Sequence, residues 1–248
     1  ACETSTAVAH PIQEISKRVH QKSNALFLVD AITALGAYDL PFDAWEIDGM
    51  VGGSQKAFML PTGLAFVAFS KRAWERIEKN PLPRFYFDIR KELAANKKGE
   101  TFFSSNVQLI RALDTVLDLI HETGLPSLFS TISKRAEFTR TVGARLGLEL
   151  YSQSPSPSVT ALQVPKDIDS QKLRQNIELK YGITIMGGQD QLKGKILRIG
   201  HMGHITNEDQ LRLAKTLYQA LAEMKPEQWP ISELQKFESN CKEILESL

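Results

Sequence analysis

The stretch Ala25-Leu26-Phe27-Leu28-Val29-Asp30 is a continuous apolar run that ends abruptly in a carboxylate. A run that is apolar at every position is typical of a strand covered on both faces, as in a parallel sheet. Two more such runs follow, over residues 47–51 and 63–69, and the second of these leads directly into a helical pattern at 71–79. Apolar strands that alternate with helices predict an α/β layered domain.

The C-terminal half has a different pattern. A loop rich in Ser and Pro at 152–158 is followed by predicted strands at 159–164, 183–186 and 195–199, an order that favours a small α+β domain. The spacing of apolar residues predicts helices over 12–20, 85–98, 107–121, 127–146, 170–181, 208–224 and 231–248. We therefore expect a large domain over 1–122, a small domain over 123–225, and a helical extension over 226–248.

The composition excludes several classes of protein. The 248 residues carry 30 Lys and Arg against 29 Asp and Glu, a balance that argues against a nucleic-acid module or a polybasic membrane binder. No apolar run approaches the roughly 20 residues of a spanning helix. Cys2 and Cys241 form no metal-binding pattern, and nothing near His201 and His204 completes a ligand set, so no metal site is expected. The absent signals favour a cytoplasmic protein.

Two strand ends carry side chains that could share one pocket. Asp30 closes the first apolar run, and Lys56 follows the second after the turn Gly52-Gly53-Ser54-Gln55. In α/β sheets, ligands bind beyond the carboxyl ends of the strands, so an acid and an amine placed there can line one site. Two other roles stay open from the residues alone: Asp30 can cap a helix, and Lys56 can be a solvated surface lysine.

Five motifs follow one another along the chain. They are Glu3-Thr4-Ser5-Thr6-Ala7-Val8, Leu28-Val29-Asp30-Ala31, Gly53-Ser54-Gln55-Lys56-Ala57-Phe58-Met59-Leu60-Pro61-Thr62-Gly63-Leu64, Gly182-Ile183-Thr184-Ile185-Met186-Gly187-Gly188 and Leu197-Arg198-Ile199-Gly200-His201-Met202-Gly203. Together they resemble the class V aminotransferases of the alanine–glyoxylate and serine–glyoxylate type, which use pyridoxal 5'-phosphate. The resemblance runs collinearly to about residue 224. It implies part of a fold-type I transferase, with a mostly parallel three-layer sheet and a small α+β domain.

The resemblance also implies roles for three charged residues. Lys56 matches the lysine that forms a Schiff base with the cofactor aldehyde and then moves the substrate's α-proton. Asp30 matches the acid that keeps the pyridine nitrogen protonated. Arg198 matches the arginine that binds the substrate carboxylate through a two-pronged hydrogen bond, and its alternative is an edge-strand arginine that faces water.

Further cofactor contacts are implied for four polar residues. Gln55 resembles the family's phosphate contact, and Ser5 resembles the position beside the ring and its 3'-oxygen. Thr101 or Ser104 resembles the segment that reaches the cofactor phosphate of a partner subunit, although Phe102 and Ser105 replace prolines that are common there. The resemblance therefore implies a homodimer with the active site at its interface.

The family's glycine-rich phosphate turn and its ring-stacking aromatic residue lie upstream of the Glu3-Thr4-Ser5 motif. Roughly the first third of the family pattern is thus absent, and we expect the chain alone to bind the cofactor poorly. The implied reaction is transamination between alanine or serine and glyoxylate or pyruvate. One alternative is a cysteine desulfurase-like enzyme, which needs a mobile cysteine. Another is a non-catalytic subunit of a larger complex, since some cyanobacterial relatives carry the label of a soluble hydrogenase (tritium-exchange) subunit.

Overall fold

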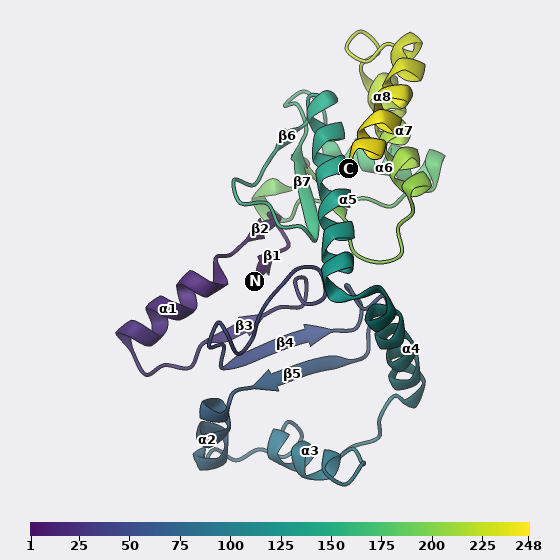
Figure 1. The fold of residues 1–248 in the computed structure, drawn as a ribbon. Coiled ribbons are helices and arrows are strands. Elements are labelled where there is room, and N and C mark those ends of the chain that lie inside the picture. Colours follow the sequence, from purple (N-terminus) through teal and green to yellow (C-terminus); the bar gives the residue numbers. More distant parts are fainter. The chain divides into compact units, whose positions relative to one another are not determined.

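The computed structural model describes residues 1–248 and divides into two compact units, each assembled from separate stretches of the chain (Figure 1). The first unit comprises Ala1, Pro11–Leu35 and Asp39–Glu122. The second comprises Cys2–His10, Gly36–Tyr38 and Thr123–Leu248. The segment that carries the Glu3-Thr4-Ser5 motif therefore belongs with the C-terminal half of the chain.

The first unit contains a small sheet and four helices. Its elements are α1 (Ile12–Lys22), β3 (Leu28–Asp30), β4 (Gly49–Gly53), β5 (Ala65–Phe69), α2 (Lys71–Lys79), α3 (Ile89–Asn96) and α4 (Val107–Thr123). The strands lie in the order β3-β4-β5, with β3 and β4 parallel and β4 and β5 antiparallel. Strand β5 returns antiparallel because residues 54–64 are too few for a parallel crossover, which needs about a dozen residues or more.

One buried carboxylate holds the start of this sheet together. Asp48 accepts hydrogen bonds from the backbone N–H of Phe27 (2.8 Å), from Ser70 Oγ (2.8 Å) and from Arg72 Nε (3.0 Å). Burial opposes the charge on Asp48, but the bonds from Arg72, Phe27 and Ser70 outweigh that effect and lower its pKa to about 2. Asp48 thereby joins the residues before β3 to the first turn of α2.

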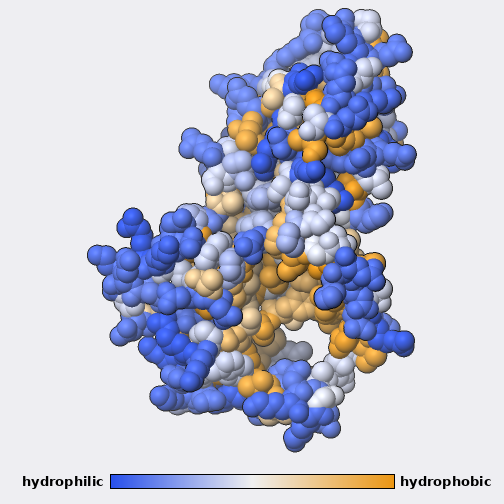
Figure 2. Space-filling model, viewed as in Figure 1, coloured by the Kyte–Doolittle hydropathy of each residue, from blue (hydrophilic) through white to orange (hydrophobic).

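One face of this sheet is uncovered, contrary to the prediction of strands buried on both sides. Strand pairing places Leu28 and Phe69 on the same face as Val51 and Val67. Leu28 is 64% exposed and Val67 is 55% exposed. Figure 2 shows apolar surface gathered over the sheet and α4 of this unit. The strand sequences are apolar on both faces, but this chain supplies a covering layer for only one of them.

The second unit contains a four-stranded sheet with its helices on one side. Its elements are β1 (Cys2–Glu3), β2 (Val8–Ala9), α5 (Leu125–Arg145), β6 (Glu149–Leu150), β7 (Val159–Gln163), α6 (Ser170–Tyr181), β8 (Met186–Gly187), η1 (Asp190–Leu192), β9 (Ile196–Gly200), α7 (Asn207–Met224), η2 (Ile231–Glu233) and α8 (Leu234–Ser247). The sheet order is β6-β7-β9-β8, and every neighbouring pair is antiparallel.

The two faces of this sheet are covered by different elements. Leu162 and Leu197 lie in one core with residues of α5, α6, α7 and α8. Val159, Ala161 and Ile196 lie on the other face in a small cluster with Ala7 from the segment between β1 and β2. The final helix contributes Phe237, Cys241 and Ile244 to the larger core, so α8 is packed into the second unit. Arg198 shares its face with Ala161, its partner across the β7–β9 pair.

Several predicted elements differ in extent from those observed. The helix expected over 85–98 spans only Ile89–Asn96, because Asp88 adopts an extended conformation and caps the first turn by accepting a bond from Arg90 N–H. The strand expected over 183–186 is limited to Met186–Gly187, where it pairs with β9. The two-residue strands β1, β2 and β6 have no counterpart in the prediction.

Candidate active site

Two of the predicted residues lie at one edge of the first unit's sheet. Strands β3 and β4 run in the same direction, with Asp30 opposite Val51. Asp30 is the last residue of β3, and β4 ends at Gly53, shortly before Lys56. The carboxyl ends of neighbouring parallel strands meet at one edge of a sheet, so Asp30 and Lys56 come from adjacent strand ends.

The loop that carries Lys56 is fixed by a buried serine. The Ser54 hydroxyl donates to the Pro61 carbonyl (2.7 Å) and accepts from Leu64 N–H (3.2 Å), and the Ser54 carbonyl accepts from Leu60 N–H (3.1 Å). Ser54 has no exposed surface. One side chain therefore ties the start of the loop to its end. Lys56 is half-buried in this loop and forms none of the ion pairs of the chain.

Asp30 caps a turn and keeps its carboxylate at the surface. Its Oδ1 accepts a hydrogen bond from Ile32 N–H (2.9 Å), and turns rather than a helix follow β3. The alternative role as a helix cap is therefore wrong. Asp30 is exposed, so its carboxylate can be reached by a ligand at the sheet edge.

Gln55 lies next to Lys56 and folds back over the end of β4. A Cβ atom added to Gly53 would stand 2.8 Å from Gln55 Oε1, so the amide rests against the Gly53 main chain. A larger residue at position 53 would displace the Gln55 side chain from this place. Gln55 thus joins Asp30 and Lys56 in the first unit, giving a carboxylate, an amine and an amide.

Arg198 lies in the second unit and is held by main-chain carbonyls. Its Nε donates to the Gly187 carbonyl (2.7 Å) and its Nη1 to the Thr4 carbonyl (2.9 Å). Burial lowers the pKa of Arg198, nearby Arg174 lowers it further, and Glu3 opposes the change. These two bonds leave the outer hydrogens of the guanidinium for an external carboxylate. The sequence alone gave no sign of the contact with Thr4.

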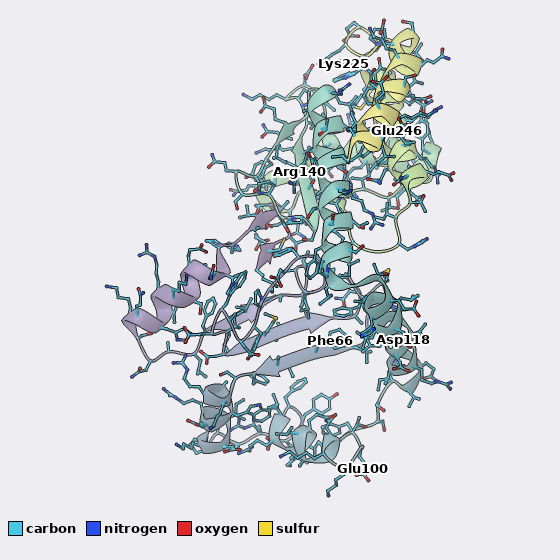
Figure 3. All side chains as sticks on the ribbon, viewed as in Figure 1. Phe66, Glu100, Asp118, Arg140, Lys225 and Glu246 are labelled. Carbon is cyan, nitrogen blue, oxygen red and sulfur yellow. The ribbon has the colours of Figure 1, made fainter.

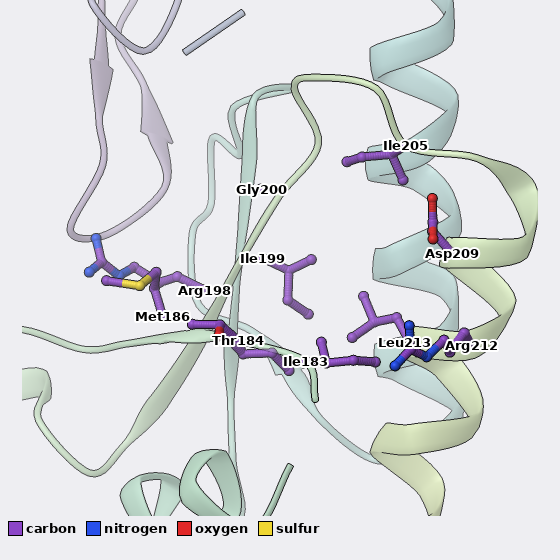
Figure 4. Close-up of a pocket in the computed structure, with 11 residues that line it drawn as sticks. Ile183, Thr184, Met186, Arg198, Ile199, Gly200, Ile205, Asp209, Arg212 and Leu213 are labelled. Carbon is purple, nitrogen blue, oxygen red and sulfur yellow. The ribbon is translucent and has the colours of Figure 1, made fainter. Parts of the chain in front are cut away.

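Figure 4 shows the surroundings of Arg198 in the second unit. A pocket of about 260 Å³ is lined by Ile199, Leu213 and Arg212, among others. Arg198 and Met186 point away from Ile199 and Leu213 in this view, as expected for neighbouring strand residues that alternate between faces. The Arg198 guanidinium therefore belongs to the opposite face of the sheet from these apolar residues.

Ser5 is held beside the Thr4 carbonyl that binds Arg198. The Ser5 hydroxyl (2.6 Å) and the Ser5 N–H (2.8 Å) both donate to Glu3 Oε1. These bonds lower the pKa of Glu3. The structure therefore brings Ser5 and Arg198 into one neighbourhood of the second unit, together with Glu3, which the sequence analysis did not single out.

Thr101 and Ser104 lie in the exposed connection between α3 and α4. The Thr101 hydroxyl donates to the Phe103 carbonyl (2.7 Å). Phe103 in turn packs against Phe85 and Phe102 with ring centroids 6.2 and 4.5 Å apart. The contacts of this loop are thus local, and its expected role toward a partner subunit stays a prediction.

His201 has a structural partner. Its Nε2 lies 2.8 Å from Thr160 Oγ1, and burial, with smaller effects of Arg140 and Arg135, lowers the pKa of His201 to about 3. Arg135 donates to the carbonyls of His201, Gly203 and Ile205 and so fixes the loop after β9. Arg140, labelled on α5 in Figure 3, donates to the Ser156 carbonyl (2.7 Å).

The two cysteines do not suit a sulfur-transfer reaction. Cys241 is buried in α8, and burial raises the pKa of its thiol to about 11. A catalytic cysteine has to be accessible and readily ionised. Cys2 is half-buried, with its sulfur 3.7 Å from the Ser158 hydroxyl. The structure therefore does not favour the desulfurase alternative.

The fold defines an α/β protein with two groups of candidate residues. The first unit has the acid, amine and amide of Asp30, Lys56 and Gln55 at a sheet edge, and the second has the Arg198 guanidinium held by main-chain carbonyls. The sequence model of the family described as aminotransferase class-V matches residues 1–213. The chain belongs to this family.

The relatives of this chain carry two kinds of name. A protein of Synechococcus sp. (strain PCC 6716) named soluble hydrogenase, small subunit, is 38% identical over 224 residues, which are 90% of this chain and 58% of that protein. Serine–glyoxylate aminotransferase of Hyphomicrobium methylovorum is 31% identical over 229 residues, which are 90% of this chain and 56% of that protein. The chain thus spans less than two thirds of the length of these relatives.

A solved structure has the same fold. Ureidoglycine–glyoxylate aminotransferase of Bacillus subtilis matches with a TM-score of 0.85 and 26% identity, covering 98% of this chain and 64% of that one. The α/β fold of a pyridoxal-phosphate enzyme predicted from the sequence is confirmed. In addition, no helix of the structure has both the length and the apolar character to cross a membrane.

The residues of the first unit fit pyridoxal phosphate. A carboxylate suits the protonated ring nitrogen, an unpaired amine suits the aldehyde, and an amide N–H suits a phosphate oxygen. Asp30, Lys56 and Gln55 supply these groups at adjacent strand ends.

Proposed function

We propose that the protein carrying this chain transfers an amino group between alanine or serine and glyoxylate or pyruvate, with pyridoxal 5'-phosphate as cofactor. The observation that carries the proposal is that Asp30 ends β3 and Lys56 follows shortly after the end of β4, the parallel neighbour of β3. The names of the relatives from Hyphomicrobium methylovorum and Bacillus subtilis support a glyoxylate acceptor.

The cofactor, when bound, supplies an aldehyde that takes up the amino group and a ring that withdraws electrons from the substrate. In this proposal Asp30 holds the proton on the ring nitrogen, and Gln55 donates to the phosphate. Lys56 Nζ would hold the cofactor through its aldehyde and, when free, would accept the proton from the substrate Cα.

In the second unit, Arg198 binds the substrate carboxylate with its outer guanidinium hydrogens, because its Nε and Nη1 are already oriented by Gly187 and Thr4. Ser5 donates to the 3'-oxygen of the ring. Both roles are proposals that the resemblance supports. The predicted homodimer, with Thr101 or Ser104 reaching the phosphate in a partner subunit, belongs to the same proposal. The cytoplasmic location predicted from the sequence stays a prediction.

The test is to add pyridoxal phosphate to the purified chain and record its visible absorption spectrum. We expect a band from the lysine–cofactor adduct that is lost in Lys56→Ala and kept in Lys71→Ala, a control at an exposed lysine of α2. The titration extends to millimolar cofactor, so that weak binding is also detected. Absence of the band, or a band that survives Lys56→Ala, would contradict the proposal.

The alternative of a non-catalytic subunit is supported by the name of the Synechococcus relative. It differs from the proposal in one measurable respect. An aminotransferase changes its cofactor spectrum when alanine or serine is added alone, because the amino group passes to the cofactor. A non-catalytic subunit shows no such change.

A further inference from the structure

The pocket shown in Figure 4, called the α7 pocket below, is apolar inside and has charged residues at its mouth. Its apolar lining includes Ile183 before β8, Ile199 of β9 and Leu213 of α7. Asp209 and Arg212 of α7 line the same pocket, and both are exposed, so their charged ends lie at the mouth. The volume of about 260 Å³ is just below the roughly 300–1,000 Å³ of pockets for drug-sized ligands, so the pocket fits a smaller molecule.

The two charged residues lie on one face of α7 without bonding to each other. Residues three positions apart on a helix are neighbours, with Cβ atoms about 5–6 Å apart. No ion pair joins Asp209 and Arg212. An anion site and a cation site are therefore held side by side over one apolar pocket, with room between them for a ligand that carries both charges.

Arg212 is held in place with part of its guanidinium free. Its Nη2 donates to the Tyr181 carbonyl (2.8 Å). A Cβ atom added to Gly182 would stand 3.8 Å from this Nη2, so the guanidinium rests beside the main chain that follows α6. The Nε and Nη1 hydrogens take part in no hydrogen bond or ion pair of the chain. Arg212 thus presents oriented donors to an external carboxylate.

Asp209 has one carboxylate oxygen in use and one available. Its Oδ2 accepts from the Thr206 N–H (2.8 Å) and from the Thr206 hydroxyl (2.9 Å), whereas Oδ1 accepts no hydrogen bond. The bonds from Thr206, with a smaller effect of nearby Arg212, lower the pKa of Asp209, so its carboxylate is charged at neutral pH. Oδ1 can therefore accept from an external ammonium group while the cap of α7 stays intact.

We propose that the α7 pocket binds an α-amino acid with an aliphatic side chain of about the size of leucine. The carboxylate of this ligand binds Arg212, and its ammonium group binds Asp209 Oδ1. Its side chain packs against Ile199 and Leu213. A simple carboxylate or a simple amine would satisfy only one of the two charges, and a polar side chain would lose its hydrogen bonds to water against the apolar lining.

This site is separate from the substrate site proposed above. The Arg198 side chain points away from Ile199 and Leu213, toward the opposite face of the sheet (Figure 4). A ligand in the α7 pocket therefore does not contact the Arg198 guanidinium. The proposal goes beyond the proposed function and does not depend on it.

The experiment is a calorimetric titration of the chain with four probes at pH 7 and matched ionic strength. They are leucine, 4-methylpentanoate, which lacks its amino group, 3-methylbutylamine, which lacks its carboxylate, and glycine, which lacks its side chain. We expect leucine to bind about tenfold or more tightly than each of the others, because each lacks one charged hydrogen bond or the buried side chain. If any of the three binds as tightly as leucine, the proposal is overturned.

Variants assign the two charged contacts to their residues. Arg212→Gln should make leucine and 3-methylbutylamine bind equally, and Asp209→Asn should do the same for leucine and 4-methylpentanoate. Lys215→Gln is the matched control, because Lys215 is an exposed cation of the same helix that pairs with Glu238 and does not line the pocket. Unchanged leucine affinity in Arg212→Gln, in a chain with native circular dichroism, would contradict the proposal.

Two further variants separate this site from the proposed active site. Arg198→Gln should bind leucine as the unsubstituted chain does, because its guanidinium lies on the opposite sheet face. Leucine binding that is lost in Arg198→Gln and kept in Arg212→Gln would place the ligand at the substrate site and overturn the proposal. Lys56→Ala should also bind leucine normally, because Lys56 belongs to the other unit. A chain without a cofactor band that still binds leucine would contradict the proposed function only.

Discussion

At the scale of single residues, Asp48 is the clearest case of a charge that stabilises the fold. Asp48→Asn removes the charge but keeps the shape, so the bonds from Arg72 Nε, Ser70 and Phe27 lose their anionic acceptor. We expect the free energy of unfolding near neutral pH to fall by about 2 kcal/mol, the range for hydrogen bonds to charged groups. Urea titrations of both proteins measure the difference.

The pH dependence gives a second test at the same residue. The pKa of Asp48 is lowered from 3.8 in the unfolded chain to about 2 in the folded one. The stabilisation is therefore complete above about pH 4 and is lost as the pH falls toward 2. The two urea curves should converge over that interval. If the difference in free energy of unfolding between the two proteins stays constant down to pH 2, the charge of Asp48 is not the cause of that difference.

At the scale of elements, the start of α7 depends on a reciprocal cap. The Thr206 hydroxyl accepts from Asp209 N–H (3.1 Å), and the Asp209 carboxylate accepts from Thr206 N–H (2.8 Å). Thr206→Ala should lower the free energy of unfolding by about 1 kcal/mol, and Thr206→Ser should leave it nearly unchanged because the hydroxyl remains. Thermal unfolding of the three proteins would decide this. An equal loss in both variants would assign the effect to the methyl group.

Elements with clear local signals could be predicted from the sequence. Helices α2 and α6 have the predicted bounds, since Ser70 and Asp169 cap them and the apolar spacing continues to their last turns. Strands of two residues show no alternation, so β1, β2 and β6 carry no local signal. The same limit applies to the site. Asp30 and Lys56 stand in recognisable motifs, but the bonds of Arg198 to Thr4 and Gly187 arise only from tertiary packing.

At the scale of the whole molecule, the uncovered sheet face of the first unit predicts self-association and the binding of apolar dyes. Leu28, Val51 and Val67 form a contiguous apolar face, and such faces bind other apolar groups. Leu28→Ser combined with Val67→Thr should reduce both self-association in sedimentation experiments and the fluorescence of an apolar dye. Each change should alter stability by no more than about 0.5 kcal/mol, as is usual for surface positions.

Leu179 provides the control for that experiment. It is 86% exposed on α6 of the second unit and is not one of the residues of that sheet face. Leu179→Ser removes a comparable apolar side chain and leaves the residues of the sheet face unchanged. Dye fluorescence and self-association should therefore equal those of the unsubstituted protein. An equal effect of Leu179→Ser would mean that total surface hydrophobicity, rather than this face, causes the association.

The hydrogen bond between Arg198 and Thr4 joins positions 194 residues apart. The second unit therefore cannot complete this contact until residues 4 and 198 have come together. During synthesis on the ribosome, β1 and β2 can pair with each other early, but the bond from Arg198 to the Thr4 carbonyl cannot form until β9 has emerged. Contacts so distant in sequence slow folding, because the loop between them has to be closed first. We expect the first unit to reach its folded state earlier than the second.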